Sequence, residues 1–277
     1  MPKKNTPPRR GLRALLAAPL IAALIVGGTL GSASAASAAQ PSGVCAGANV
    51  FIGVRGTNAP GGSNPSTTGN AWQSGGMGDQ VQGLANHFKY DAPYSSAWPT
   101  YVESLNYPAS TDLIGSIAAG VQTLRAELNY IGSLCGVFTP NIILAGHSQG
   151  AAVISGVLKN PGLLNQRAKQ AIRAVALLGD PYHSANMPYS MLNNSNYGTL
   201  AMTAGEYNTI YENFRFWGWA QYSENIGWVS KVRDYCFTGD AACTGNLTDS
   251  GWQIHNAYTA LTSQITSWMD YMLTNTE

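Results

Sequence analysis

Charged residues are scarce in this chain: they make up 10% of its 277 residues, with 15 Lys and Arg against 14 Asp and Glu. Five of the basic residues lie among the first thirteen positions, so the rest of the chain has 10 basic and 14 acidic residues and a formal charge of −4. No basic stripe remains to neutralise phosphates, and the sequence therefore predicts no nucleic-acid partner. Asn, Ser, Thr, Gly and Tyr fill much of the surface instead, which suits a protein that meets uncharged material.

Metal-ligand patterns are also lacking. The chain has four His and four Cys, and no cluster of His, Cys, Asp and Glu has ligand spacing outside the cysteines that we expect to form disulfides. We therefore expect no metal and no other cofactor.

The N-terminal segment has the layout of a secretory signal peptide. Basic residues without acids are followed by an apolar run from Ala14 to about Leu30, and small residues close the run at SASAASAA. A proline and glycines interrupt the run, which disfavours the alternative of an N-terminal membrane anchor. We expect residues 1–38 to be removed, the protein to be secreted, and no stable membrane anchor to remain. Arg9-Arg10 leaves twin-arginine export open.

Four cysteines in an exported chain predict two disulfides rather than four free thiols. Three pairings are possible on paper. Cys236 and Cys243 lie seven residues apart around FTGDAA, a span that a tight loop closes easily, which leaves Cys45 for Cys135. Each of the latter two precedes a strand-like run, so their bridge would tie two neighbouring strands at their N-terminal ends.

The order of elements predicts an α/β fold with a central, mostly parallel sheet and helices on both faces. Strand-like runs alternate with helical ones, and the clearest helix repeats apolar residues at spacings of three and four. The predicted strands cover 49–55, 101–106, 142–145, 172–178 and 231–237, and the predicted helices cover 78–90, 113–131, 149–159 and 255–273. Without a visible repeat or second domain, residues 39–277 are predicted to form a single domain.

The stretch IILAGHSQGAAVISG joins a buried strand to a helix through a serine that lies between glycines. The pattern G-x-S-x-G in this setting is a nucleophile elbow, where the backbone turns sharply and holds the Ser148 hydroxyl clear of the sheet. The backbone N–H of Gln149 would begin the helix and face a developing oxyanion. An ordinary strand-to-helix turn is the alternative, but the strand before it and the small-residue helix after it favour catalysis.

A serine nucleophile needs a base, and the chain offers four histidines. His147 lies inside the elbow and would point away from Ser148, and His87 lies far upstream on a predicted helix. His183 follows GDPY and stays a rival. His255 opens the last predicted helix and follows every candidate acid, the chain order expected for this fold, so it is the predicted base.

Four aspartates fall between the serine and this histidine: Asp180, Asp234, Asp240 and Asp249. Asp180 ends the strand after the nucleophile helix, one strand early for the usual acid, and Asp234 falls within a predicted strand. Asp240 lies just beyond the end of that strand, in the short loop that the second predicted disulfide would close. Because the disulfide would hold its carboxylate in place, Asp240 is the predicted acid.

The motifs CFTGDAACTG and IHNAY, with AGHSQGA upstream and FIGVRGT near the start, resemble those of the cutinases and acetylxylan esterases, secreted serine esterases that share one small α/β-hydrolase fold. The resemblance covers the expected mature chain from about Cys45 to the end, and its pieces agree in order and in cysteine placement. It implies a triad of Ser148, Asp240 and His255. It also implies an oxyanion hole built from the N–H groups of Gln149 and Thr57, where the Thr57 hydroxyl helps to bind the oxyanion; many relatives have serine there.

The segment around 183–235 departs from this resemblance, because it looks longer than in the compact fungal cutinases. It holds six aromatic residues: Phe214, Phe216, Trp217, Trp219, Tyr222 and Trp228. Aromatic residues in such numbers usually pack a subdomain. Alternatively, Trp217 and Trp219 belong to a flap or wall beside Ser148 that binds an acyl chain, a polymer segment or a sugar face.

The sequence therefore predicts a secreted, monomeric carboxylic ester hydrolase that works through an acyl-enzyme. Expected substrates are cutin or other polyesters, lipid-like esters, and short to medium acyl esters. Acetylxylan esterase and lipase or phospholipase activities are the alternatives among enzymes. An inactive hydrolase fold that binds a surface or a carbohydrate is the non-enzymatic alternative, and the intact triad in the expected order argues against it.

Overall fold

The computed structural model describes residues 45, 49–61, 76–91, 93–135, 138–192, 195–221 and 226–275. In these ranges six strands form one sheet in the order β2-β1-β3-β4-β8-β5, and each strand is parallel to its neighbours. The strands are β1 (Asn49–Val54), β2 (Thr100–Ser104), β3 (Asn141–His147), β4 (Ile172–Leu178), β5 (Ser190–Met191) and β8 (Val232–Tyr235). The predicted parallel sheet is confirmed, whereas the predicted signal peptide, 1–38, lies outside the described residues.

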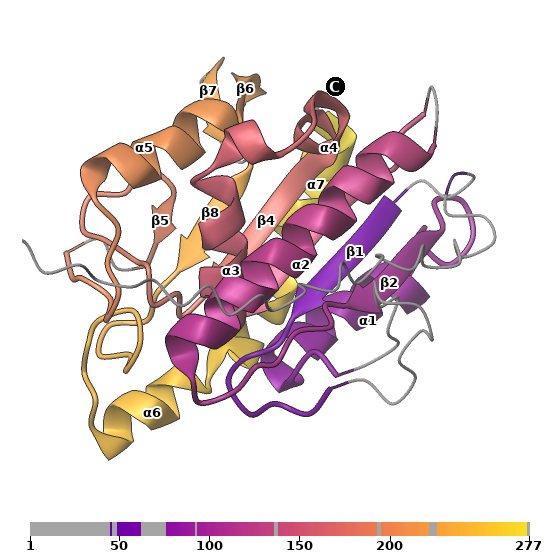
Figure 1. Cartoon of the computed structure of the whole chain (residues 1–277). Coiled ribbons are helices and arrows are strands. Elements are labelled where there is room, and N and C mark those ends of the chain that lie inside the picture. The colour runs from indigo at the N-terminus through magenta and orange to yellow at the C-terminus, as the bar shows by residue number, and fades with distance from the viewer. Residues whose placement is uncertain are drawn as a thin grey trace, which may run out of the picture. The chain divides into compact units, whose positions relative to one another are not determined.

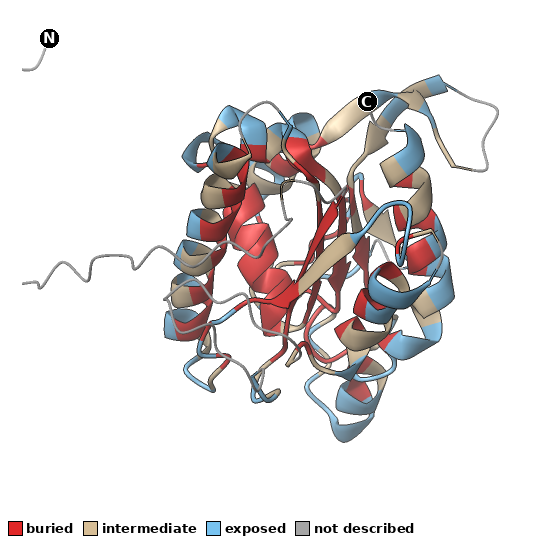
Figure 2. Ribbon diagram, turned by 90° about the vertical axis from the view of Figure 1, so that its right-hand side faces the viewer, coloured by how far each residue is buried: buried red, intermediate tan, exposed pale blue. Residues whose placement is uncertain are grey.

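Helices cover both faces of this sheet, as Figures 1 and 2 show. One face carries α1 (Asp79–Tyr90) and α7 (Thr262–Asn275); the other carries α2 (Leu113–Leu134), α3 (Gln149–Leu158), α4 (Gln166–Ala171) and α5 (Ala204–Asn213). Two cores result, because successive residues of a strand point to opposite faces. In β1, Val50 and Ile52 pack towards α2 and α3, whereas Phe51 stacks on Phe88 of α1.

The two predicted disulfides, Cys45–Cys135 and Cys236–Cys243, are both present. The first bridges the segment before β1 to the end of α2. The second closes the short loop after β8. Both pairings agree with the argument from spacing.

The last predicted helix is wrong at its start. His255 does not open it but lies at the end of a separate helix, α6 (Asp249–His255), and a 3₁₀ turn, η2 (Tyr258–Leu261), precedes α7. The missed signal is Thr248, whose side chain accepts the N–H of Gly251 at 3.2 Å and so caps a new helix.

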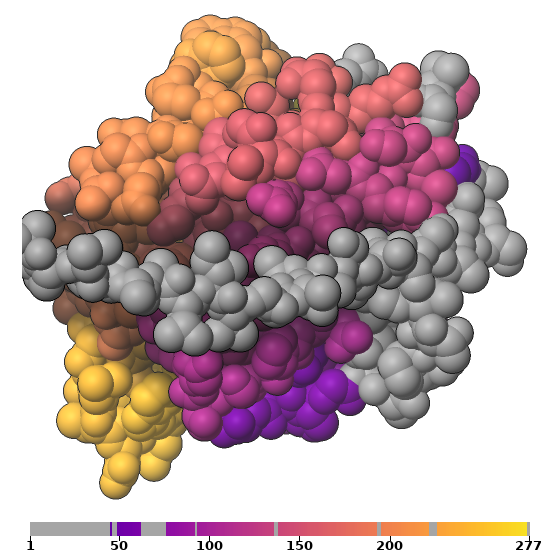
Figure 3. All heavy atoms as spheres, viewed as in Figure 1, coloured from indigo at the N-terminus to yellow at the C-terminus, as the bar shows by residue number. Residues whose placement is uncertain are grey.

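The aromatic-rich segment contains a hairpin that stands apart from the central sheet. Its strands, β6 (Arg215–Trp219) and β7 (Ile226–Ser230), pair antiparallel, and β7 leads into the N-terminal end of β8. In Figure 1 the hairpin lies at the top and α6 at the bottom, and the space-filling view in Figure 3 shows the same separation. The carboxyl ends of β3, β4 and β8 face α6. The hairpin therefore lies at the other end of the sheet, where these strands begin. Within the described ranges, no helix is both long and apolar enough to span a bilayer.

Candidate active site

Ser148 lies between β3 and α3 in a backbone conformation that residues other than glycine rarely adopt. Its φ is 56° and its ψ is −123°, and its N–H donates to the carbonyl of Leu178 in β4 at 2.9 Å. The turn also needs glycine at 150, because a Cβ there would lie 2.1 Å from the carbonyl oxygen of Val54. This geometry matches the one expected for a nucleophile elbow, in which a strained turn presents the serine hydroxyl above the sheet.

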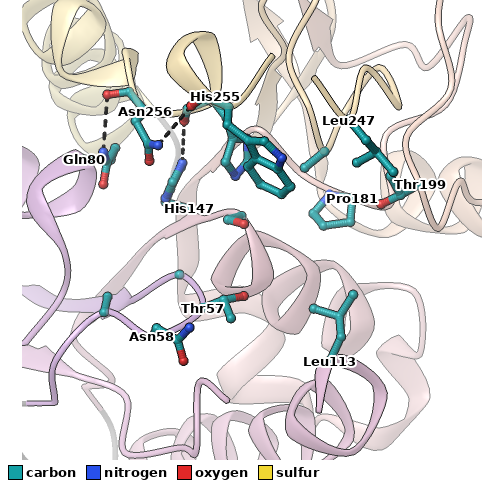
Figure 4. Close-up of a pocket in the computed structure, with 15 residues that line it drawn as sticks. Thr57, Asn58, Gln80, Leu113, His147, Pro181, Thr199, Leu247, His255 and Asn256 are labelled. Atoms are coloured by element: carbon teal, nitrogen blue, oxygen red, sulfur yellow. Dashed lines mark hydrogen bonds between the residues drawn. The ribbon is translucent and has the colours of Figure 1, made fainter. Parts of the chain in front are cut away.

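Ser148 borders a cavity of about 720 Å³ at the carboxyl edge of the sheet. Figure 4 shows Thr57, Asn58 and Leu113 on one side and Pro181, Thr199, Leu247 and His255 on the other. The other lining residues are Gly56, Ala59, Gln80, His147, Ala242, Trp252 and Asn256. A cavity of this size, with apolar walls and a few polar groups, is typical of small-molecule sites.

His255 and Asp240 meet in a buried hydrogen bond, with 2.9 Å between Nδ1 and Oδ2. A carboxylate can only accept, so Nδ1 carries the proton and Nε2 of the neutral ring does not. In the described part of the chain Nε2 is buried and has no hydrogen-bond partner, and the ring borders the same cavity as Ser148. A ring with this tautomer is prepared to accept a proton from the cavity.

Four donors surround the carboxylate of Asp240. The N–H groups of Ala242 and Cys243 donate to Oδ1 at 2.7 and 2.8 Å, and the Tyr258 hydroxyl donates to Oδ2 at 2.8 Å beside His255. Burial by itself raises the pKa of Asp240, but the bond from His255 and the other hydrogen bonds outweigh it and lower the pKa below its usual value. Asp240 therefore stays ionised and holds the imidazole in one orientation.

Thr57 and Gln149 lie next to Ser148 in space. Thr57 borders the cavity, and Gln149 is the first residue of α3, where the N–H has no acceptor within the helix. Their side chains are joined, because Gln149 Nε2 lies 3.2 Å from Thr57 Oγ1. The structure thus brings together the residues expected at an oxyanion hole.

A comparison with family models matches residues 44–273 to the family described as Cutinase. The chain belongs to the cutinase family. This membership makes it a carboxylic ester hydrolase and confirms the resemblance seen in the sequence. Enzymes of the cutinase family are typically secreted, and the two disulfides fit an extracellular protein.

Solved structures share the fold of this cutinase-family enzyme. The catalytic core of an acetyl xylan esterase from Trichoderma reesei is 20% identical with a TM-score of 0.59, over 82% of this chain and 98% of that one. A cutinase-like protein from Cryptococcus sp. is 18% identical with a TM-score of 0.55, over 87% of this chain and 98% of that one. No curated protein matches the sequence significantly.

The rival acids of this cutinase-family chain lie elsewhere. Asp234 is fully buried with its Oδ2 2.9 Å from Nδ1 of His183, the rival base. Asp180 accepts from the Ser155 hydroxyl, and burial together with the nearby Asp234 raises the pKa of Asp180 to about 7. Asp249 is exposed at the start of α6. Among the four candidates, Asp240 is the aspartate that contacts His255.

Trp217 and Trp219 do not reach the cavity. They lie on the outer face of the hairpin, 60% and 56% exposed, and neither lines the site. The reason is topological. The hairpin leads into the beginning of β8, whereas Asp240 follows the carboxyl end of β8 and Ser148 follows the carboxyl end of β3. On its inner face Phe216 packs against the core, which agrees with the simpler expectation of a packed subdomain.

Several residues that face or support the site were not predicted. Nε2 of His147 donates to the main-chain carbonyl of His255 at 2.8 Å, and burial together with the charge of His255 lowers the pKa of His147 to about 3. His147 and Tyr258 both occur in the recognised motifs, so the signal for them was present. Leu247 and Trp252 line the cavity, but no local pattern marks them. Among the described residues, no group of three or more potential metal ligands was found.

Proposed function

We propose that this cutinase-family enzyme is a secreted, monomeric serine esterase with Ser148 as nucleophile, His255 as base and Asp240 as orienting acid. The observation that supports this best is the meeting, at one cavity, of a strained serine and a histidine whose Nδ1 is held by a buried carboxylate. His255 takes the hydroxyl proton through Nε2 as the oxygen of Ser148 attacks the ester carbonyl. Asp240 stabilises the imidazolium that forms.

The remaining steps follow from the same groups. The N–H groups of Thr57 and Gln149 receive the negative charge that develops on the carbonyl oxygen. When the tetrahedral intermediate collapses, the C–O bond to the alcohol breaks and His255 donates its proton to the leaving oxygen. Water then gives a proton to His255 and attacks the acyl-enzyme, and the acid leaves as Ser148 regains its proton. His255 thus carries both protons that the cycle moves, the first from Ser148 to the alcohol and the second from water to Ser148.

We propose short to medium acyl esters and polyesters as substrates. The cavity offers apolar surface from Leu113, Leu247 and Trp252, and the last two are 65% and 45% exposed at its edge. A strict deacetylase needs a closed acyl pocket instead. Each methylene of the acyl chain that reaches apolar surface contributes about 0.8 kcal/mol. The likeness to an acetyl xylan esterase is one of fold and does not select an acyl group.

The test is a set of rates on p-nitrophenyl esters from acetate to palmitate, with acetylated xylan and an insoluble polyester alongside. We expect butyrate to octanoate to be hydrolysed faster than acetate. Ser148→Ala should stay folded and lose several orders of magnitude in kcat, and an organophosphonate should label Ser148 in the wild type. Near-normal turnover by Ser148→Ala would reject the mechanism, whereas a clear preference for acetate and acetylated xylan would reject only the substrate class.

A further inference from the structure

The side chain of Gln149 connects the candidate oxyanion hole to helix α2. Its Nε2 donates to Thr57 Oγ1 at 3.2 Å and to the main-chain carbonyl of Ser110 at 2.9 Å. Its Oε1 accepts from the hydroxyl of Ser116 at 2.7 Å. Gln149 is fully buried and Ser116 is 2% exposed, so these bonds do not compete with bulk water.

Two main-chain groups of Ser110 determine which atom is the donor and which is the acceptor in each of these hydrogen bonds. The carbonyl of Ser110 can only accept, so the Gln149 atom that faces it is the NH₂ group, and the atom facing Ser116 is the oxygen. The N–H of Ser110 can only donate, and it donates to Oγ of Ser116 at 3.1 Å, so the Ser116 hydroxyl sends its own proton to Gln149.

The same reasoning fixes the Thr57 hydroxyl. The NH₂ group of Gln149 has no lone pair to offer, so Thr57 Oγ1 accepts from it and must direct its own proton elsewhere. Thr57 borders the cavity that contains Ser148 (Figure 4), so its proton can point to where an ester carbonyl would lie. If the amide of Gln149 were reversed, its oxygen would face Thr57 and draw that proton away from the cavity.

We propose that Ser116 is a positioning residue for catalysis: through Gln149 it fixes the Thr57 hydroxyl as a donor to the oxyanion. This inference rests on the proposed function. Ser116 is itself held firmly, because its N–H donates to the carbonyl of Asp112 at 2.8 Å in the first turn of α2. The loop that carries Thr57 is tied to the same region, since the N–H of Asn58 donates to the carbonyl of Ala109 at 2.7 Å.

The first measurement compares Ser116→Ala with a matched control, Ser133→Ala. Ser133 lies on the same helix, but it is exposed and its hydroxyl donates to the carbonyl of Asn129. For Ser116→Ala we expect kcat to fall about tenfold with KM unchanged, because the donor is loosened rather than removed. The affinity for a trifluoromethyl ketone, which forms an oxyanion on the serine, should fall by the same factor. Ser133→Ala should match the wild type.

A double-mutant cycle separates positioning from general structural support. Thr57→Val removes the donating hydroxyl, and we expect it to lower kcat about a hundredfold. In that background, Ser116→Ala should change kcat by less than about twofold, because there is no longer a hydroxyl to orient. A full tenfold loss in the Thr57→Val background would overturn the proposal, as would wild-type kcat and ketone affinity in Ser116→Ala.

Gln149→Met covers the case in which Ser116→Ala folds poorly. This substitution keeps the size of the side chain and the main-chain N–H but removes both polar groups. It should lower kcat and ketone affinity about as much as Ser116→Ala does, with KM unchanged. In the Thr57→Val background it should again change kcat very little. A folded Gln149→Met with wild-type kcat would overturn the proposal. A different result would reject the proposed function itself: Ser148→Ala would then retain turnover, whatever the effect of Ser116→Ala.

Discussion

Gly179 lies directly against His255. Its φ is +58°, and a Cβ on it would be 2.8 Å from Nδ1 of His255 and 3.0 Å from Oδ2 of Asp240. The residue after β4 is therefore part of the wall that keeps the hydrogen bond between Asp240 and His255 in place, and no side chain larger than hydrogen fits there.

Gly179→Ala should consequently reduce activity more than its effect on stability would suggest. The added methyl must displace the imidazole or the carboxylate, so we expect kcat to fall by about 10² or more, while the strained φ lowers the melting temperature. Steady-state kinetics and thermal unfolding measure the two effects. The control is Gly162→Ala, where a Cβ meets nothing within 4 Å. Equal kcat in both variants would contradict the assigned geometry.

Replacement of the aspartates separates the acid from its rivals. Asp240→Asn should lower kcat by about 10⁴, because the amide favours the wrong tautomer of His255. Asp180→Asn and Asp234→Asn remove buried carboxyls that contact Ser155 and His183, so they should act mainly on the melting temperature. A folded Asp180→Asn without turnover would exclude Asp240 as the acid that acts.

Glu103 and Glu127 are buried together, and this pair should contribute a loss of stability as the pH rises from about 4.5 to about 8. Burial raises the pKa of Glu127 to about 8; burial and the nearby Glu127 raise the pKa of Glu103. In this pH range the folded state holds protons that the unfolded state has released, so the free energy of unfolding falls with rising pH. Glu127→Gln should flatten that decline, which melting temperatures between pH 4.5 and 9 would measure. An unchanged slope would contradict the raised pKa.

Preference for acyl-chain length should depend on the cavity rim and not on the hairpin. Leu247→Ala or Trp252→Ala should lower kcat/KM for octanoate about tenfold relative to acetate, the loss expected when one or two methylenes give up apolar contact at about 0.8 kcal/mol each. Trp217→Ala and Trp219→Ala are the matched controls, since both rings lie at the opposite edge of the sheet. A selective effect of the hairpin tryptophans would show that the substrate extends much farther than the cavity.

The sequence by itself determined the features that depend on residues close together in the chain. The elbow at Ser148 needs a strand, a glycine-flanked turn and a helix in direct succession, and Cys236 pairs with Cys243 because a short loop joins them. The alternation of strands and helices was predictable for the same reason, because the spacing of apolar residues within each segment indicates a strand or a helix. The resemblance to the cutinases then implied a role for Thr57 and agreed with the triad already predicted from the residues.

Only the tertiary structure decided which distant groups meet. It placed Trp217 at the end of the sheet away from the cavity, although the hairpin lies between Ser148 and Asp240 in sequence. The contact of Gln149 with Thr57 spans 92 positions, and no local pattern encodes it. Such contacts result from how helices and strands pack over a shared core, and packing depends on the shapes of many side chains at once rather than on the period of any one segment.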